Sequence, residues 1–225
     1  MDGRTPNGPG SPGSGAGRML AATAGHRALA VQILATAGVY YGGARLGLLQ
    51  ELVRGQVTPL WPPTGIALTA LLLFGPRVWP GIALGAFLVN VSLGPSFLVV
   101  CAIVAGNTLG PLLSLRLLRR VGFHTRMDRL RDAVALVGLG ALTGMLVSAT
   151  VGSGVLVLSG ALTGADFWPT WAVWWTGDAM GVLVVTPVLL LLSTFRWPPG
   201  AASAPTGGRR ECCSGSARSP SPSSP

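Results

Sequence analysis

Six long apolar segments dominate the middle of the sequence and constrain its fold more than any other feature. They lie at roughly residues 28–49, 60–74, 78–94, 96–118, 132–158 and 168–195. A helix needs about 20 apolar residues to cross a hydrocarbon core of about 30 Å. Because lipid offers no partner to backbone polar groups, such segments form helices. The sequence therefore predicts an all-α polytopic membrane helix bundle of about six transmembrane helices.

The second segment is the shortest, and only Gly75-Pro76-Arg77 separates it from the third. The alternative to two crossings is a re-entrant hairpin, in which segments 60–74 and 78–94 enter and leave on one face. Bilayers tolerate some mismatch in length, so we expect two crossings. Either arrangement returns the chain to the same side.

The basic residues predict the orientation of the chain. All 16 are Arg; with the N-terminus inside, the outer loops hold only Arg54, while Arg45 lies within the first segment. Cytoplasmic loops of membrane proteins carry the excess of Arg and Lys. We therefore expect a multi-pass protein of the inner (plasma) membrane with both termini in the cytoplasm. Since the arginines lie between apolar segments, nucleic acid is not expected as a partner.

Composition divides the chain into three zones. Residues 1–27 and 197–225 are rich in Gly, Pro, Ser and Arg. Such segments cannot bury enough apolar surface to fold, so we expect two disordered cytoplasmic tails. Residues 28–196 form the integral membrane domain, and no output domain is expected after it.

The chain offers no recognisable catalytic or metal-binding pattern. Its 3 Cys and 2 His have no spacing suited to zinc, and without Lys it has no phosphate-binding P-loop. We therefore expect no enzyme activity, no metal and no cofactor.

Small residues recur at four-residue spacing in most of the apolar segments. A glycine-rich chain produces about three such pairs by chance, but the run of four in the fifth segment, Gly140/Gly144/Ser148/Gly152, is harder to explain in this way. Because close backbone approach drives helix association in lipid, we expect this run to form a tight seam of the bundle. The sets are Gly38/Gly42, Gly43/Gly47, Gly81/Gly85, Gly106/Gly110/Ser114, Gly140/Gly144/Ser148/Gly152 and Gly177/Gly181.

Three polar residues lie inside apolar segments, and two interpretations remain open. Asp178 and Asn107 each lie ten or eleven residues into their segments, and Arg45 lies near the outer end of the first. A charged group at the centre of a membrane helix is costly and needs a partner. The three residues either tie the helices together or line a ligand pocket. We treat all of them as ligand-binding candidates.

Tryptophans gather at the same end of the helices. Trp61, Trp168 and Trp171 fit an interfacial aromatic belt. Trp174 and Trp175 are deeper than a belt requires and lie one turn before Asp178. Trp61, Trp174 and Trp175 are therefore added to the ligand-binding candidates.

Several of these motifs resemble a known family. The motifs are the stretch Trp61-Pro62-Pro63-Thr64-Gly65, the block Gly85-Ala86-Phe87-Leu88-Val89-Asn90 and the motif Trp174-Trp175-Thr176-Gly177-Asp178-Ala179-Met180-Gly181, which leads to Pro187. They resemble the first class of bacterial membrane-associated sensor domains. The resemblance covers roughly residues 30–195. It implies structural roles for Pro62, Pro63, Gly65, Gly177, Gly181 and Pro187.

The resemblance implies a sensory input module that signals to a cytoplasmic output, such as a two-component histidine kinase, a cyclic-dinucleotide synthase or a phosphatase. The family is commonly drawn with eight spans, whereas this sequence shows six. Either a separate output protein is the partner, or a fused output domain is missing because the chain is truncated or frameshifted. A homodimer stays open. The alternative function is a small-solute transporter or permease subunit.

Overall fold

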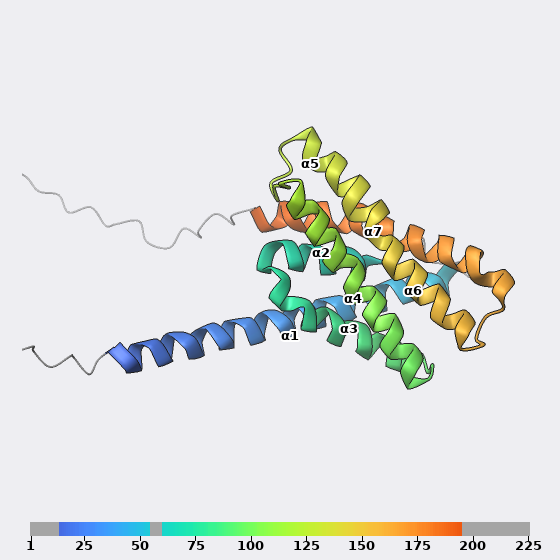
Figure 1. The fold of residues 1–225 in the computed structure, drawn as a ribbon, viewed down its shortest axis with the longest axis horizontal. Helices are drawn as coiled ribbons and strands as arrows, with labels where there is room; N and C mark the ends of the chain where they lie inside the picture. Colours follow the sequence, from blue (N-terminus) through green and yellow to red (C-terminus); the bar gives the residue numbers. More distant parts are fainter. Residues whose placement is uncertain (1–13, 55–59, 195–225) are drawn as a thin grey trace, which may run out of the picture. The chain divides into compact units, whose positions relative to one another are not determined.

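The computed structural model describes residues 14–54 and 60–194, and all regular secondary structure in these residues is helical (Figure 1). The helices are α1 (Ser14–Arg54), α2 (Pro62–Phe74), α3 (Trp79–Ser92), α4 (Phe97–Arg120), α5 (Leu130–Ala135), α6 (Met145–Leu158) and α7 (Phe167–Thr194). A π-helical segment, Leu136–Thr143, joins α5 to α6, and 3-10 turns at Pro76–Val78 and Gly164–Asp166 precede α3 and α7. The prediction of an all-α fold is confirmed.

Within residues 14–54 and 60–194, three helical stretches are long and apolar enough to cross a membrane. They are Phe97–Arg120, Leu130–Leu158 and Gly164–Thr194. With 13 and 14 residues, α2 and α3 extend about 20 Å each, less than the hydrocarbon core of about 30 Å. The helical membrane bundle is thus supported, while the number of six crossings remains a prediction.

The N-terminal prediction needs one correction. Helix α1 begins at Ser14, so residues 14–27, expected to be disordered, are helical. Their Ala-rich stretch from Ala21 to Ala24 favours a helix because alanine loses little entropy there. Residues 1–13 and 195–225, which include about half of the predicted N-terminal tail and all of the C-terminal one, lie outside the described residues.

The contacts between helices close a ring. Along it, α1 packs on α3, α3 on α4, α4 on α6, α6 on α7, α7 on α2, and α2 again on α1. Helix α2 also contacts α4 across the ring. Two apolar clusters fill the interior, one around Tyr40, Ile82 and Leu115 and the other around Leu68 and Met145. The short helix α2 contributes to both clusters, so it occupies the centre of the bundle.

Glycines form most of the helix contacts, as the small-residue spacing predicts. A methyl group on Gly81 would meet the Ile33 carbonyl oxygen of α1, and one on Gly144 would meet Ser114 of α4. Gly38 and Gly42 are the exception, because they are exposed and an added methyl would meet nothing within 4 Å. This pair takes no part in the helix contacts of the described bundle. The adjacent face of α1, with Gly43 and Gly47, makes the contact instead.

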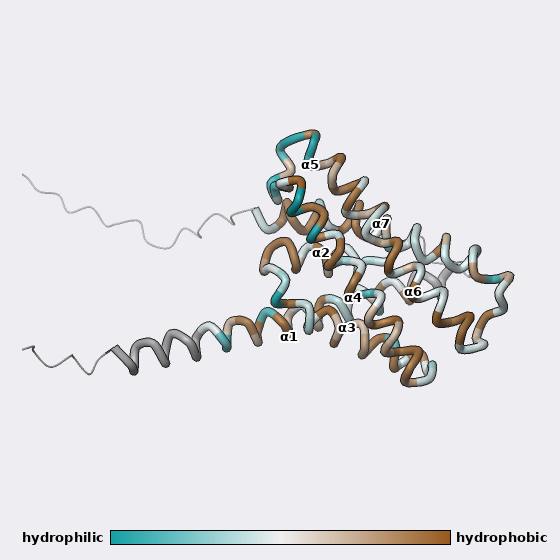
Figure 2. The backbone as a smooth tube through the Cα atoms, viewed as in Figure 1, coloured by the Kyte–Doolittle hydropathy of each residue, from teal (hydrophilic) through white to brown (hydrophobic). Residues whose placement is uncertain are grey.

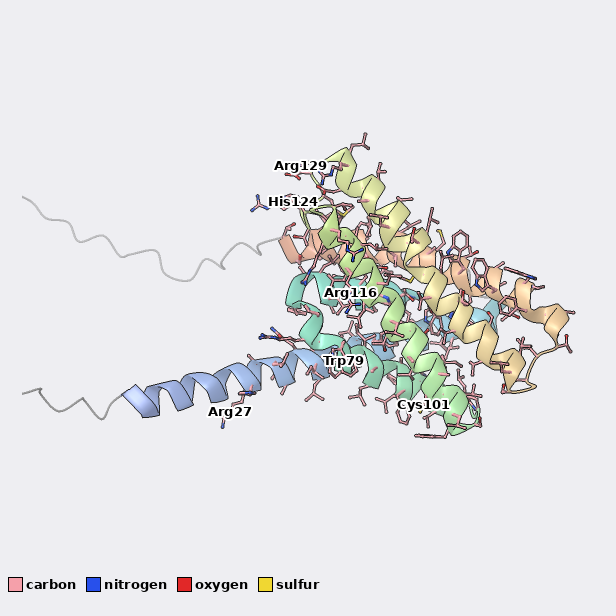
Figure 3. The ribbon with its side chains drawn as sticks, viewed as in Figure 1. Arg27, Trp79, Cys101, Arg116, His124 and Arg129 are labelled. Atoms are coloured by element: carbon pink, nitrogen blue, oxygen red, sulfur yellow. The ribbon has the colours of Figure 1, made fainter. Side chains whose placement is uncertain are left out.

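The hydrophilic residues of the described bundle gather at the turn between α4 and α5 (Figure 2). His124 and Arg129 are exposed there, whereas Cys101 lies toward the opposite end of α4 (Figure 3). Two interactions hold the turn: the His124 backbone N–H donates to Asp132 Oδ1 at 3.1 Å, and the Arg131 guanidinium donates to the Val121 carbonyl. A polar turn joining two apolar helices fits a loop at the membrane surface.

Candidate functional site

Asp178 is buried at the middle of α7 and defines the centre of the candidate site. Its side chain is only 1% exposed. It lies eleven residues after the start of the helix, or about 16 Å at 1.5 Å per residue. The Thr64 hydroxyl donates to its Oδ1 at 2.5 Å, while its Oδ2 has no hydrogen-bond partner among the described residues. Half of this carboxylate is therefore satisfied by the bundle.

The N-terminus of α2 lies beside Asp178. The helix starts with Pro62 and Pro63, which suit a first turn because its N–H groups have no helical acceptor. The Trp61 N–H donates to the Gly177 carbonyl at 3.0 Å, and Gly181 is so close to Trp61 that a methyl group would collide with the Trp61 carbonyl. These contacts bring the positive end of the α2 dipole to the carboxylate. They also give Pro62, Pro63 and Gly181 a structural function.

A polar cluster surrounds the carboxylate. Ser148 on α6 lies within reach of both Asp178 and Asn107, and its hydroxyl donates to Asn107 Oδ1 at 3.0 Å. The buried Tyr40 of α1 places its hydroxyl within hydrogen-bonding reach of Asn107 and Trp61. The cluster thus joins side chains of α1, α2, α4, α6 and α7 at one depth.

A cavity of about 310 Å³ adjoins this cluster. Its walls come from the start of α2, the end of α3, the middle of α4 and the first half of α7. The lining residues are Trp61, Val89, Asn90, Leu93, Asn107, Thr170, Val173, Trp174, Gly177 and Asp178. The volume and the mixture of apolar walls with a few polar groups are typical of a small-molecule site.

Glycines make room for the two tryptophans that line the cavity. The Trp174 ring lies against Gly152 of α6, and the Trp61 ring against Gly47 of α1. Any larger side chain at either glycine would displace an indole ring. Part of the glycine seam therefore positions the site as well as the helices.

Trp175 is oriented differently from its neighbour Trp174. Its indole N–H donates to the Leu142 carbonyl at 2.9 Å, and its ring stacks on Trp171 at 5.7 Å between centroids. Trp171 in turn donates to the Thr150 hydroxyl at 3.1 Å. Trp175 and Trp171 thus fasten α7 to the π-helical segment and α6, and Trp175 does not line the cavity. Successive residues of a helix point about 100° apart, which separates the two indoles.

Arg45 does not reach the carboxylate. Its side chain is exposed, and it is not among the residues that line the cavity. The expectation that Asp178 is buried against Arg45, Asn107 or both is corrected for Arg45: the direct partner is Thr64, and Ser148 lies between Asp178 and Asn107. The exposed position fits a long basic side chain that extends away from the bundle.

The C-terminal half of α7 contacts α2 through a hydrogen bond. The Thr186 hydroxyl donates to the Gly65 carbonyl at 3.1 Å, and a methyl group on Gly65 would meet Gly181 and Val185. Pro187 follows directly and removes one backbone donor from the helix, which weakens α7 at this point. The motif residue Gly65 thus lies at a contact between α2 and α7, and Pro187 directly follows the α7 residue that makes this contact.

Sequence reasoning missed Tyr40, Thr64, Ser148 and Asn90 as members of the site. Thr64 lies within a stretch that the resemblance already quoted, so its position offered a signal. Ser148 offered one too, because it belongs to the small-residue run expected at the seam of the bundle. Tyr40 offered none, because it is one polar residue on a helix whose rotation the sequence leaves open. Among the residues described, no cluster of three His, Cys, Asp or Glu side chains could hold a metal ion.

A helical bundle with long apolar helices, and with a buried carboxylate beside a cavity, has the architecture of an integral membrane protein. The sequence matches the membrane-associated sensor domain family MASE1 over residues 32–206. The chain belongs to this family of membrane sensory input domains. Comparison with curated proteins and with solved structures gave no match.

Proposed function

We propose that this chain detects a small ligand from the outer side or from the membrane and signals to a cytoplasmic partner. One observation supports this more than any other: a cavity at half the depth of the bundle adjoins a buried carboxylate with a free oxygen. Buried Asp132 in the first turn of α5 also has an unpartnered Oδ2, so the cavity beside Asp178 is what distinguishes this acid from a structural one. A binding site gives the free oxygen of Asp178 a function.

The route of the signal follows α7 and α2. Asp178 and Trp174 line the cavity, and Thr186 and Pro187 lie two to three turns further along the same helix. Helix α2 contacts α7 at both of these places: Thr64 bonds to Asp178, and the Gly65 carbonyl accepts from Thr186. A ligand that displaces Asp178 therefore shifts α7 against α2, and the weakened backbone at Pro187 allows the following turns to move.

The receiver in this proposal is a cytoplasmic output protein or domain, such as a histidine kinase or a cyclic-dinucleotide synthase. A two-component pathway in a bacterium is the setting that the family resemblance implies. The chain itself serves as input and carries out no catalysis.

The test joins a diguanylate cyclase domain to the C-terminus of the full chain and measures cyclic-dinucleotide output in cells. We expect Asp178→Asn and Trp174→Leu to change output by about fivefold or more, the lower range of ordinary allosteric coupling. Val188→Ala is the control, because Val188 lies on the same helix and is 52% exposed. Output that is the same in all four proteins at equal membrane levels would contradict the proposal.

A transporter is the second candidate, and one observation favours it. Helix α2 starts at Pro62, beside the middle of α7, so its N-terminus lies at a polar cavity inside the bundle. Interrupted helices of this kind surround the substrate sites of many secondary transporters. Uptake of labelled solutes by vesicles containing the purified chain alone separates the candidates: uptake supports transport, and its absence supports the sensor.

A further inference from the structure

We propose that the cavity binds a small organic ammonium cation, held by the Asp178 carboxylate and the indoles of Trp61 and Trp174. This inference rests on the proposed sensor function and names the class of its ligand. Its basis is the chemistry of the cavity wall together with the free oxygen of the buried acid.

The first argument is that the neighbouring hydroxyls are already used. Thr64 donates to Asp178 Oδ1, and Ser148 has a single hydroxyl hydrogen, which it donates to Asn107. The Tyr40 hydroxyl interacts with Asn107 and Trp61. Oδ2 of Asp178 is therefore left as a buried acceptor without a donor among the described residues, in a residue that lines the cavity. A ligand with an N–H group would supply that donor.

The second argument concerns charge. Of the ten residues that line the cavity, Asp178 is the acid and none is basic. The nearest expected counter-ion in α1, Arg45, is exposed instead. Buried charges in proteins are paired or neutralised. A cavity with one carboxylate and no basic side chain on its wall therefore favours a cation over an anion.

The third argument comes from the aromatic and apolar walls. Indole rings attract cations through their electron-rich faces, and tryptophan does so best among the aromatic side chains. Val89, Leu93 and Val173 supply apolar surface for the carbon skeleton of the ligand. At about 310 Å³, the cavity is at the small end of drug-sized sites, which suits a single small molecule.

The experiment measures binding of three probes to the purified full chain in detergent micelles. Phenethylammonium, 2-phenylethanol and phenylacetate share an aromatic skeleton and differ in charge. Isothermal titration gives the affinities, and tryptophan fluorescence reports on Trp61 and Trp174. Micelles without protein correct for partitioning of the probes.

We expect saturable binding of phenethylammonium that is at least about tenfold tighter than that of the alcohol, or about 1.4 kcal/mol, and no binding of phenylacetate. Asp178→Asn should remove this preference, and Trp174→Leu should weaken binding. Two matched controls should bind as the wild type does: Asp132→Asn, which alters a buried carboxylate outside the cavity, and Trp168→Leu, which alters an exposed indole of α7.

Equal affinity for the cation and the alcohol, preference for the anion, or no saturable binding by the folded protein would overturn the inference. The probe series uses the wild-type chain, so this result does not depend on whether Asp178→Asn folds. If no cation binds while the cavity variants still change the output of the cyclase fusion, the ligand class is wrong and the sensor proposal stands. If the cation binds while output is unchanged, the sensor proposal fails.

Discussion

The contact between Gly181 and Trp61 gives the sharpest test of how the bundle is built. A methyl group added at Gly181 would be directed at the Trp61 carbonyl oxygen. This neighbour belongs to the backbone, and two bonds hold it: the Trp61 N–H donates to Gly177, and the Thr64 N–H donates to the Trp61 carbonyl at 3.4 Å. Gly181→Ala therefore forces α7 away from the start of α2.

The expected cost follows from three contributions. Overpacking costs about 1–3 kcal/mol, and loss of the Trp61–Gly177 hydrogen bond costs about 1 kcal/mol. Replacing Gly by Ala inside a helix returns about 1 kcal/mol. We expect Gly181→Ala to lower the free energy of unfolding by about 1–3 kcal/mol.

Gly42→Ala is the matched control, because Gly42 lies inside α1 and an added methyl would meet nothing within 4 Å. We expect this variant to be stabilised by about 0.5–1 kcal/mol. The assay is unfolding in mixed detergent micelles, followed by circular dichroism, for both variants and the wild type. If Gly181→Ala is as stable as Gly42→Ala, the packing of α2 on α7 described above is incorrect.

Two further predictions test the site and the orientation. Thr64→Val removes the donor to Asp178 Oδ1, so the free energy of unfolding in the same micelles should fall by about 1–3 kcal/mol. The control Thr69→Val removes only a bond to Gly65 within α2 and should cost less. Equal losses would show that the Thr64–Asp178 bond contributes nothing. Alkaline phosphatase joined after Gln56 should be active in the periplasm, and joined after His124 it should be inactive. The reason is that the arginine-rich segments are expected on the cytoplasmic side. The reverse pattern would refute the proposed orientation.

The outcome at Asp178 shows how far reasoning about polar groups can go. The cost of a charge in lipid predicted that Asp178 faces the interior, and the structure buries it. The same reasoning could not choose the partner. Arg45 and Asn107 both remained open as partners, whereas a short hydroxyl on a neighbouring helix, Thr64, makes the bond. Which side chain meets a carboxylate depends on helix depth and rotation, which local sequence does not specify.

The sequence by itself determined the elements of this protein: hydropathy and length placed five of the six apolar segments within two residues of the helices that form. The tertiary structure alone decided which faces of those helices meet. Membrane helices are apolar all round, so their periodicity does not mark the buried side. Gly38 and Gly43 look alike in the sequence, yet only Gly43 packs against α2. The polar cluster around Asp178 exists because Tyr40, Thr64 and Ser148 converge from different helices, and only packing of the whole bundle brings them together beside the cavity.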